Sequence, residues 1–281
     1  MATLNKNYRP LCRREAKKRL ENIATFSSFY NDLNKVFVKN SVYYKTFFSI
    51  MEDIVIPAKQ REYAEKNLPV IIEKIPDLLM MDFNEETSLT ESDVIYKHSE
   101  FYNAVINVLS LPLTIVNNFR GIFLEDFIHK VGPSLPRNQK EYYRYMSPVI
   151  QVGNALIKLK EKDNDVDVLF LNVDSHDTIV EIEAIECKSS INTFMYSVKN
   201  HLENNNRNSR RDYNKILYMQ DILDYSAADS SECTIGFATY ESEMNIKYIY
   251  DFKNEFTHSI FDFIRQKTII IDRNHLLKLV I

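Results

Sequence analysis

Two closely spaced runs of apolar residues, Val166–Val173 and Ile179–Lys188, constrain the fold of this chain more than any other feature. Each has the length and the β-branched content of a strand. Only the short polar segment Asp174–Thr178 separates them, which predicts that the two strands follow each other in a meander. A third strand is predicted before them at Ala155–Lys160, and the polar turn Glu161–Asp165 connects it to the next strand. The sequence therefore predicts a sheet that begins with three meandering strands.

Helical patterns surround this predicted sheet. A helix at Phe119–Val131 precedes it and ends at Gly132-Pro133, because a glycine followed by a proline is a strong helix stop. The segments after the meander are predicted as a helix at the start of 191–211, strands at Ile216–Met219 and Thr234–Thr239, a helix at Ile260–Arg265 and a short strand at Thr268–Ile271. We therefore expect an α/β protein with a mixed β-sheet core flanked by helices.

The first part of the chain is predicted to be helical throughout. Apolar residues recur there at steps of three and four, which is typical of amphipathic helices. The expected helices are Arg13–Ile23, Phe29–Val38, Tyr43–Ile54, Ala58–Asn67, a short one bracketed by Pro69 and Pro76, and Phe101–Leu109, with an acidic loop at Asp82–Ser92. We expect a helical N-terminal lobe over residues 1–117, used for recognition or dimerisation, and a core over 118–281. Whether the two pack as one unit stays open.

Charged residues mark one end of the two best-defined strands. Asp167 stands at the start of the first run, and Glu186 and Lys188 stand at the end of the second. Residues two apart on a strand point to the same face, so Glu186 and Lys188 share one face, and a neighbouring strand brings Asp167 beside them. Val180, Ile182 and Ala184 lie on that face, which is predicted to be the buried one, while Glu181, Glu183 and Cys187 point the other way. A buried charged pair needs a reason, and two carboxylates can bind Mg²⁺.

These residues resemble the motif of the PD-(D/E)XK nuclease superfamily, and within it the type II restriction endonucleases. The resemblance covers residues 119–240 and consists of a helix with Glu125, a strand with Asp167, and a strand ending in Glu186-Cys-Lys188. It implies a restriction-endonuclease-like fold, with Asp167 and Glu186 as Mg²⁺ ligands, Lys188 positioning or activating the attacking water, and Glu125 assisting. Val166 stands where the motif has proline.

Simpler interpretations of the same residues stay open. Glu186 and Lys188 are also compatible with a structural ion pair, which is worth little when it is exposed. Asp165 is an alternative first metal ligand, although the apolar run begins directly after Asp167. Glu125 is equally compatible with a surface acid on a helix.

Basic and amide side chains cluster after the second strand. Four asparagines and three arginines lie within residues 204–211. Asparagine can bind adenine and arginine can bind guanine by paired hydrogen bonds in the major groove of DNA. We expect contacts with double-stranded DNA from Lys199, Asn204, Arg207, Arg210 and Arg211, although a solvated polar loop would have the same composition. A homodimer is expected as well, because two-fold symmetry suits the cutting of two strands at a palindrome.

Composition and missing motifs exclude other classes of function. The net charge is −4, so the whole chain is not a basic coat for nucleic acid, although residues 1–20 carry seven Lys and Arg. The three cysteines are far apart, which argues against a disulfide framework and favours a cytoplasmic protein. No apolar stretch is long enough for a signal peptide or a membrane span. A glycine-rich phosphate loop is missing, so no nucleotide cofactor is expected.

The function expected from the sequence is that of a Mg²⁺-dependent type II restriction endonuclease that cuts double-stranded DNA at a short specific site. Two alternatives stay open. One is a nuclease of the same fold that acts on DNA structure in repair, recombination or transposition. The other is a non-catalytic module that binds DNA or protein, in which Glu186 and Lys188 form a structural pair.

Overall fold

The computed structural model of the chain describes residues 26–54, 61–133, 142–149, 165–176, 179–228, 232–246 and 258–280, together with the backbone of three short strands. These are β1 (Leu11–Cys12), β4 (Gln151–Val152) and β5 (Ala155–Leu156). The predicted helix at 13–23 and the basic residues around it lie outside the described part.

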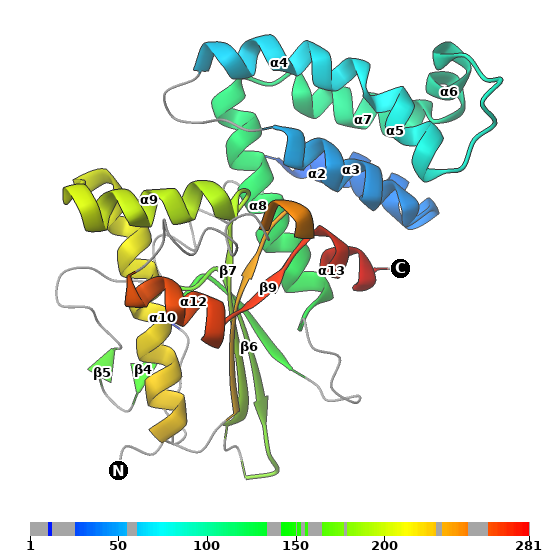
Figure 1. Cartoon of the computed structure of the whole chain (residues 1–281). Helices are drawn as coiled ribbons and strands as arrows, with labels where there is room; N and C mark the ends of the chain where they lie inside the picture. Colours follow the sequence, from blue (N-terminus) through cyan, green and yellow to red (C-terminus); the bar gives the residue numbers. More distant parts are fainter. Residues whose placement is uncertain are drawn as a thin grey trace.

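A mixed sheet forms the centre of the core (Figure 1). Within the described residues it has five strands in the order β2 (Tyr143–Met146), β6 (Val168–Val173), β7 (Ile179–Cys187), β8 (Glu232–Ala238) and β9 (Ile269–Ile271). The pairs β2·β6 and β6·β7 are antiparallel, whereas β7·β8 and β8·β9 are parallel. The predicted α/β class, with a mixed sheet flanked by helices, is therefore confirmed.

Two of the strand predictions need correction. Within the predicted strand at 155–160, Ala155 and Leu156 form a strand that pairs with β4 outside the main sheet, and residues 157–160 lie outside the described part. The first strand of the meander is β2, a half-exposed edge strand whose Tyr143 and Arg144 give no apolar run. The segment Ile216–Met219 is part of helix α10 (Arg210–Ala228), where Ile216, Met219 and Ile222 lie three residues apart and are all buried.

After β1, the described residues of the N-terminal part are mainly helical, as predicted. Its helices are α2 (Ser27–Lys39), α3 (Val42–Asp53), α4 (Arg61–Glu73), α5 (Ile75–Asp82), α6 (Glu91–Lys97), α7 (Ser99–Leu109) and α8 (Leu113–Val131). Pro69 lies inside α4 instead of ending it, and Pro76 lies in the first turn of α5. Helix α6 was not predicted, although Thr90 and Asp93 form a capping box at its start.

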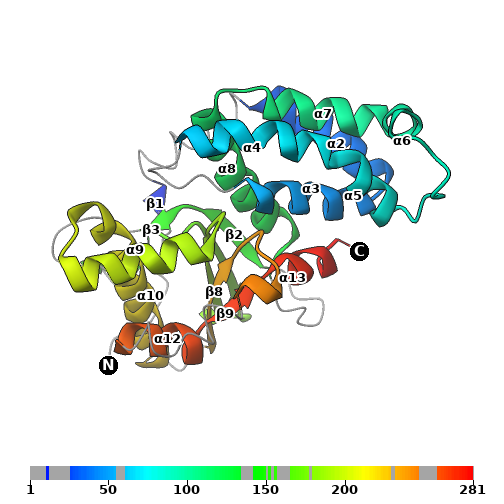
Figure 2. The same cartoon turned by 45° about the horizontal axis from the view of Figure 1, so that its top comes forward.

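Helices cover both faces of the sheet (Figure 2). On one face, Leu169, Ile182 and Ala184 pack in a buried cluster with α9 (Ile191–Asn204), α10 and α12 (Ser259–Lys267). On the other face, Phe170 and Ile185 pack in a second buried cluster with α8 and the helices of the N-terminal part. Because both faces are covered, the strands in the middle of the sheet are almost completely buried.

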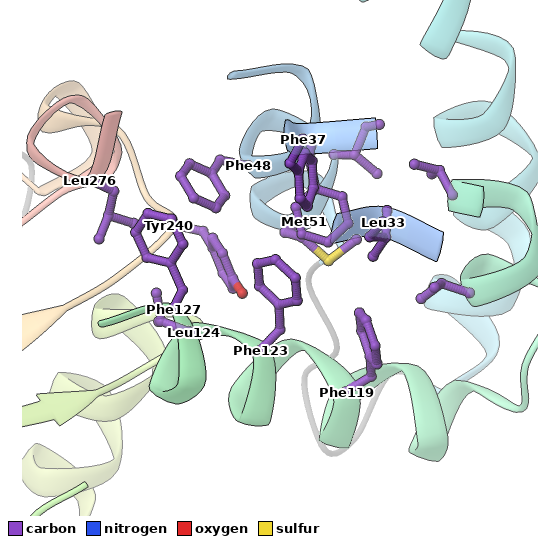
Figure 3. Close-up of a cluster of buried hydrophobic side chains, with 14 of the residues drawn as sticks. Leu33, Phe37, Phe48, Met51, Phe119, Phe123, Leu124, Phe127, Tyr240 and Leu276 are labelled. Atoms are coloured by element: carbon purple, nitrogen blue, oxygen red, sulfur yellow. The ribbon is translucent and has the colours of Figure 1, made fainter. Parts of the chain in front are cut away.

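The second cluster joins the N-terminal helices to the sheet. Figure 3 shows Phe48 of α3 and Phe127 of α8 beside Tyr240, which follows β8, and Leu276 of α13 (Arg273–Lys278). A polar contact adds to this junction, because Glu52 of α3 accepts hydrogen bonds from Ser242 N at 2.7 Å and from Arg273 Nη1 at 2.6 Å. The predicted boundary at 117/118 lies inside α8. The division into two domains stays a prediction.

Candidate functional site

Asp167 and Glu186 lie opposite each other at one end of the sheet. Val168 of β6 pairs with Ile185 of β7, so the same antiparallel register places Asp167 across from Glu186. The Asp167 carboxylate is buried, and its Oδ2 accepts a hydrogen bond of 2.8 Å from the backbone N–H of Cys187. The backbone of β7 therefore fixes the position of this acid.

Lys188 completes the group that the sequence predicted. Its backbone N–H donates to the carbonyl oxygen of Ala238 at 2.8 Å, which continues the parallel pairing of β7 with β8. Its Nζ donates to Oε1 of Glu186 at 2.9 Å. The Glu186 side chain is 1% exposed and that of Lys188 is 20% exposed, so the lysine forms the more accessible side of the pair.

A second lysine, Lys215 of α10, also belongs to this group. Its Nζ donates to Oε2 of Glu186 at 3.0 Å and to Oδ1 of Asp165 at 3.0 Å, and also to the Asp165 carbonyl oxygen. Sequence reasoning missed this residue because the segment after it was taken for a strand. A prediction of α10 as a helix would have placed Lys215 on the same face as Ile222, seven positions later. A lysine on that buried face would have indicated a buried charge.

The cluster has an unequal number of positive and negative groups. Asp165, Asp167 and Glu186 are three buried acids, and Lys188 and Lys215 are two buried or half-buried bases. Burial and the neighbouring Asp167 raise the pKa of Glu186, while the two lysines act against this rise. Burial by itself would lower the pKa of Lys215, but Glu186, Asp167 and Asp165 outweigh burial and raise it. The same balance with Glu186 and Asp167 raises the pKa of Lys188.

Both faces of β7 are buried, which corrects part of the sequence argument. Glu181 and Glu183 were expected on the exposed face, yet both are buried as well. Glu181 Oε2 accepts hydrogen bonds from Tyr142 Oη at 2.6 Å and from Asn172 Nδ2 at 3.1 Å. Burial alone therefore does not distinguish Glu186 from the other acids of the strand. The expectation that Cys187 packs in the opposite core is confirmed.

The other predicted residues occupy different surroundings. Glu125 is buried on α8, where its negative charge contributes to the raised pKa values of Tyr30 and Tyr240. It is therefore not the surface acid of the simpler interpretation, and its part in a reaction stays a prediction. Asp165 contacts Lys215 and lies in the same cluster, so the choice between Asp165 and Asp167 as the first ligand also stays open.

The predicted DNA-contacting residues lie along α9 and the turn that leads into α10. Lys199 is half-buried on α9, 3.9 Å from Oε1 of Glu203. Asn204, Arg207, Arg210 and Arg211 are exposed. Arg210 and Arg211 begin the helix that carries Lys215, so this basic segment is connected to the charged cluster through α10. Its contact with DNA stays a prediction.

A polar cavity of about 400 Å³ opens beside Lys188. Its wall combines α8, the start of α9 and the first turn of α10, together with the end of α3. The lining residues are Ile54, Asn117, Arg120, Lys188, Ser189, Ser190, Thr193, Phe194, Ser197 and Asp212. The cavity gives a small molecule or a chemical group access to the more exposed side of the Glu186–Lys188 pair.

The acids of the cluster suit Mg²⁺ in ligand type, because this ion binds carboxylate oxygens and usually keeps several waters. Within the described residues of this cluster, the three acids outnumber the two lysines by one. In the arrangement described, Lys215 holds Oε2 of Glu186. No group of three or more His, Cys, Asp and Glu side chains that could hold a metal ion occurs in the described ranges.

Comparison of the chain with protein-family models, with curated proteins and with solved structures finds no match. Among the helices that the structure describes, none by itself is long and apolar enough to cross a membrane; the pair Ser99–Leu109 and Leu113–Val131 reaches that length and hydropathy only together, across a bend of 120°.

Proposed function

We propose that this protein is a Mg²⁺-dependent endonuclease of the type II restriction class, with a restriction-endonuclease-like core. One observation supports this most strongly: Asp167, Glu186 and Lys188 converge where β6 begins and β7 ends. An acid beside a Glu-x-Lys pair at a sheet end is the arrangement that the resemblance to the PD-(D/E)XK superfamily implies. The order of elements agrees, since a helix, three antiparallel strands, helices and a parallel strand follow one another.

In this proposal, Asp167 and Glu186 hold the metal ion. A bound Mg²⁺ would stabilise the negative charge that develops on a phosphate during hydrolysis. Lys188 keeps its proton because Glu186 and Asp167 surround it, so its ammonium group donates hydrogen bonds to a water or a phosphate oxygen. Asp167 is held by the Cys187 N–H, which fixes the carboxylate before substrate arrives.

The test is digestion of plasmid and phage DNA by the purified protein, with Mg²⁺ and with EDTA. Asp167→Asn and Lys188→Ala are expected to lower the cutting rate by at least about a hundredfold, because each removes a group that acts on the reacting phosphate. Both variants are expected to bind DNA still. Lys35→Ala, an exposed lysine of α2, is the matched control and keeps the wild-type rate. Cutting at the wild-type rate by Asp167→Asn and Lys188→Ala would contradict the proposal.

The pattern of fragments distinguishes a restriction enzyme from a structure-specific nuclease. Discrete bands that need Mg²⁺ support recognition of a short sequence, and mapping of the ends then gives that sequence. Preferential cutting of branched over linear duplexes would instead support the nuclease of repair, recombination or transposition. A homodimer belongs to the restriction proposal, and light scattering of the protein bound to a palindromic duplex measures it.

A specific contact favours a second candidate, the non-catalytic binding module. Both carboxylate oxygens of Glu186 already accept hydrogen bonds from lysines, so this carboxylate is satisfied without a metal ion, as in a structural ion pair. Under this candidate, the protein binds DNA tightly and cuts none of the linear, plasmid or branched substrates with Mg²⁺ or Mn²⁺. Any Mg²⁺-dependent cutting that Asp167→Asn removes would exclude it.

A further inference from the structure

Arg120 is a buried charged residue with an unsatisfied donor among the described residues. It lies on α8 and is 3% exposed, and its Nε has no hydrogen-bond partner within the described part of the chain. A buried polar donor without a hydrogen-bond partner is costly. Burial lowers the pKa of Arg120 to about 10, so the guanidinium still carries its charge at neutral pH. The groups around this side chain decide which ligand it can bind.

Arg120 lines the same cavity as Lys188, so two cationic side chains from different elements border one space. Asn117 lies one turn before Arg120 on α8, and Ser189, Thr193 and Ser197 contribute hydroxyl groups from the other side. Asp212 is the acid of the lining, and Glu241 is near enough to Arg120 to act on its pKa. Amide and hydroxyl donors beside two cations suit an anion with several acceptor oxygens.

The start of α9 is not the source of binding here. Its backbone N–H groups are already occupied, because Glu241 Oε2 accepts from Ile191 N at 2.8 Å and Asn192 N at 3.3 Å. The Ser190 hydroxyl also donates to Glu241, at 2.8 Å. An anion in the cavity would therefore bind side chains, with Arg120 as the central donor.

We propose that this cavity binds a phosphate group of a polynucleotide, held by the guanidinium of Arg120 and the amide of Asn117. A guanidinium presents several N–H donors in one plane and matches phosphate oxygens well. A volume of about 400 Å³ accommodates a phosphate with part of its sugar. The choice of a DNA phosphate rests on the proposed function, since Lys188 borders both the cavity and the acid pair. The phosphate bound here would anchor the strand next to the bond that is cut.

Tyr240 positions this arginine. Its hydroxyl donates to the carbonyl oxygen of Arg120 at 2.9 Å, and its ring is fully buried against Phe48. Because the hydrogen bond goes to the main chain, the guanidinium remains available to a ligand. The sheet thus fixes the segment of α8 that carries Arg120 without neutralising its charge.

The test measures binding of inorganic phosphate and of a short DNA duplex by isothermal titration calorimetry in EDTA. Asn117→Asp introduces a negative charge at an exposed lining position and is expected to weaken phosphate binding about tenfold or more, since like charges repel. Asn118→Asp, the same change at the next exposed position and outside the lining, is the matched control with wild-type affinity. Arg120→Gln is expected to abolish binding, with circular dichroism used to confirm its fold.

Equal phosphate affinity in the wild type, Asn117→Asp and folded Arg120→Gln would overturn the proposal, as would a wild type that binds no phosphate at millimolar concentration. Binding of free phosphate but not of the duplex would leave the anion site and overturn its assignment to a polynucleotide. Because no metal and no cutting are involved, the result is independent of the nuclease assay. A protein that never cuts DNA but binds phosphate through Arg120 would refute only the enzymatic proposal.

Discussion

At the scale of single residues, Lys215 connects the stability of the fold to the candidate metal site. It holds the buried carboxylates of Asp165 and Glu186, so Lys215→Met removes the lysine that pairs with Asp165 and leaves Glu186 paired with Lys188. We expect the free energy of unfolding to fall by about 3–5 kcal/mol in EDTA, as is typical when one partner of a buried ion pair is removed. Chemical denaturation measures this loss. Lys35→Met on α2, where the lysine side chain is 71% exposed, is expected to change stability by less than about 0.5 kcal/mol.

The same variant tests whether a cation replaces the ammonium group. Without Lys215, Oε2 of Glu186 and Oδ1 of Asp165 become available to a divalent ion. We therefore expect Ca²⁺ to raise the melting temperature of Lys215→Met more than that of the wild type. An equal shift in the two proteins would mean that Lys215 and the cation do not share these oxygens.

Residues of the site differ in how well the sequence could predict them. Asp167, Glu186 and Lys188 were predictable as a group because they flank strands that are themselves apolar and short. Lys215 and Arg120 were not predictable, because the role of each depends on contacts with residues far away in the sequence. Lys215 binds Asp165, fifty positions earlier. Arg120 lines the cavity only because α8 packs beside α9. Long-range contacts of this kind leave no periodic pattern in a sequence.

At the scale of elements, two glycines at the middle and end of α8 allow opposite predictions. A Cβ at Gly121 would meet no atom within 4 Å, so Gly121→Ala is expected to stabilise the protein by about 0.5–1 kcal/mol through a stiffer helix. A Cβ at Gly132 would overlap the Phe170 ring and lie 2.9 Å from the carbonyl oxygen of Ile128. Gly132→Ala is therefore expected to cost about 1–3 kcal/mol. Thermal unfolding compares both variants, and equal shifts would contradict this packing.

Elements were predictable where apolar residues form a short run or follow a single clear period. Strands β6 and β7 come from such runs and helices α2, α3 and α7 from such a period, and their predicted and observed bounds differ by at most two residues. Strand β2 escaped prediction because it is an edge strand with exposed Tyr143 and Arg144. The segment Ile216–Met219 was wrongly predicted as a strand, because four mostly apolar residues fit a strand as well as a buried turn of α10.

At the scale of the whole molecule, one buried cluster unites the N-terminal helices with the sheet. Phe48 of α3 is fully buried, with its ring centre 5.1 Å from that of Phe127 and 5.6 Å from that of Tyr240. Phe48→Ala is expected to lower the free energy of unfolding by about 3–5 kcal/mol.

The shared cluster also predicts a single unfolding transition, seen at the same denaturant concentration by far-ultraviolet circular dichroism and by tyrosine fluorescence. Separate transitions of the helical part and the sheet would contradict a shared core.

That shared cluster also bears on how the chain folds as the ribosome produces it. Leu33 and Phe37 of α2 are buried in the same cluster as Ile271 and Leu276, which are made much later than α2. Glu52 of α3 likewise forms its hydrogen bonds with Ser242 and Arg273, which are made much later than α3. The first helices therefore cannot complete their packing until residues 271–276 have left the ribosome. We expect the apolar faces of these helices to stay accessible to chaperones until then, so that packing of this cluster lags behind synthesis of the helices.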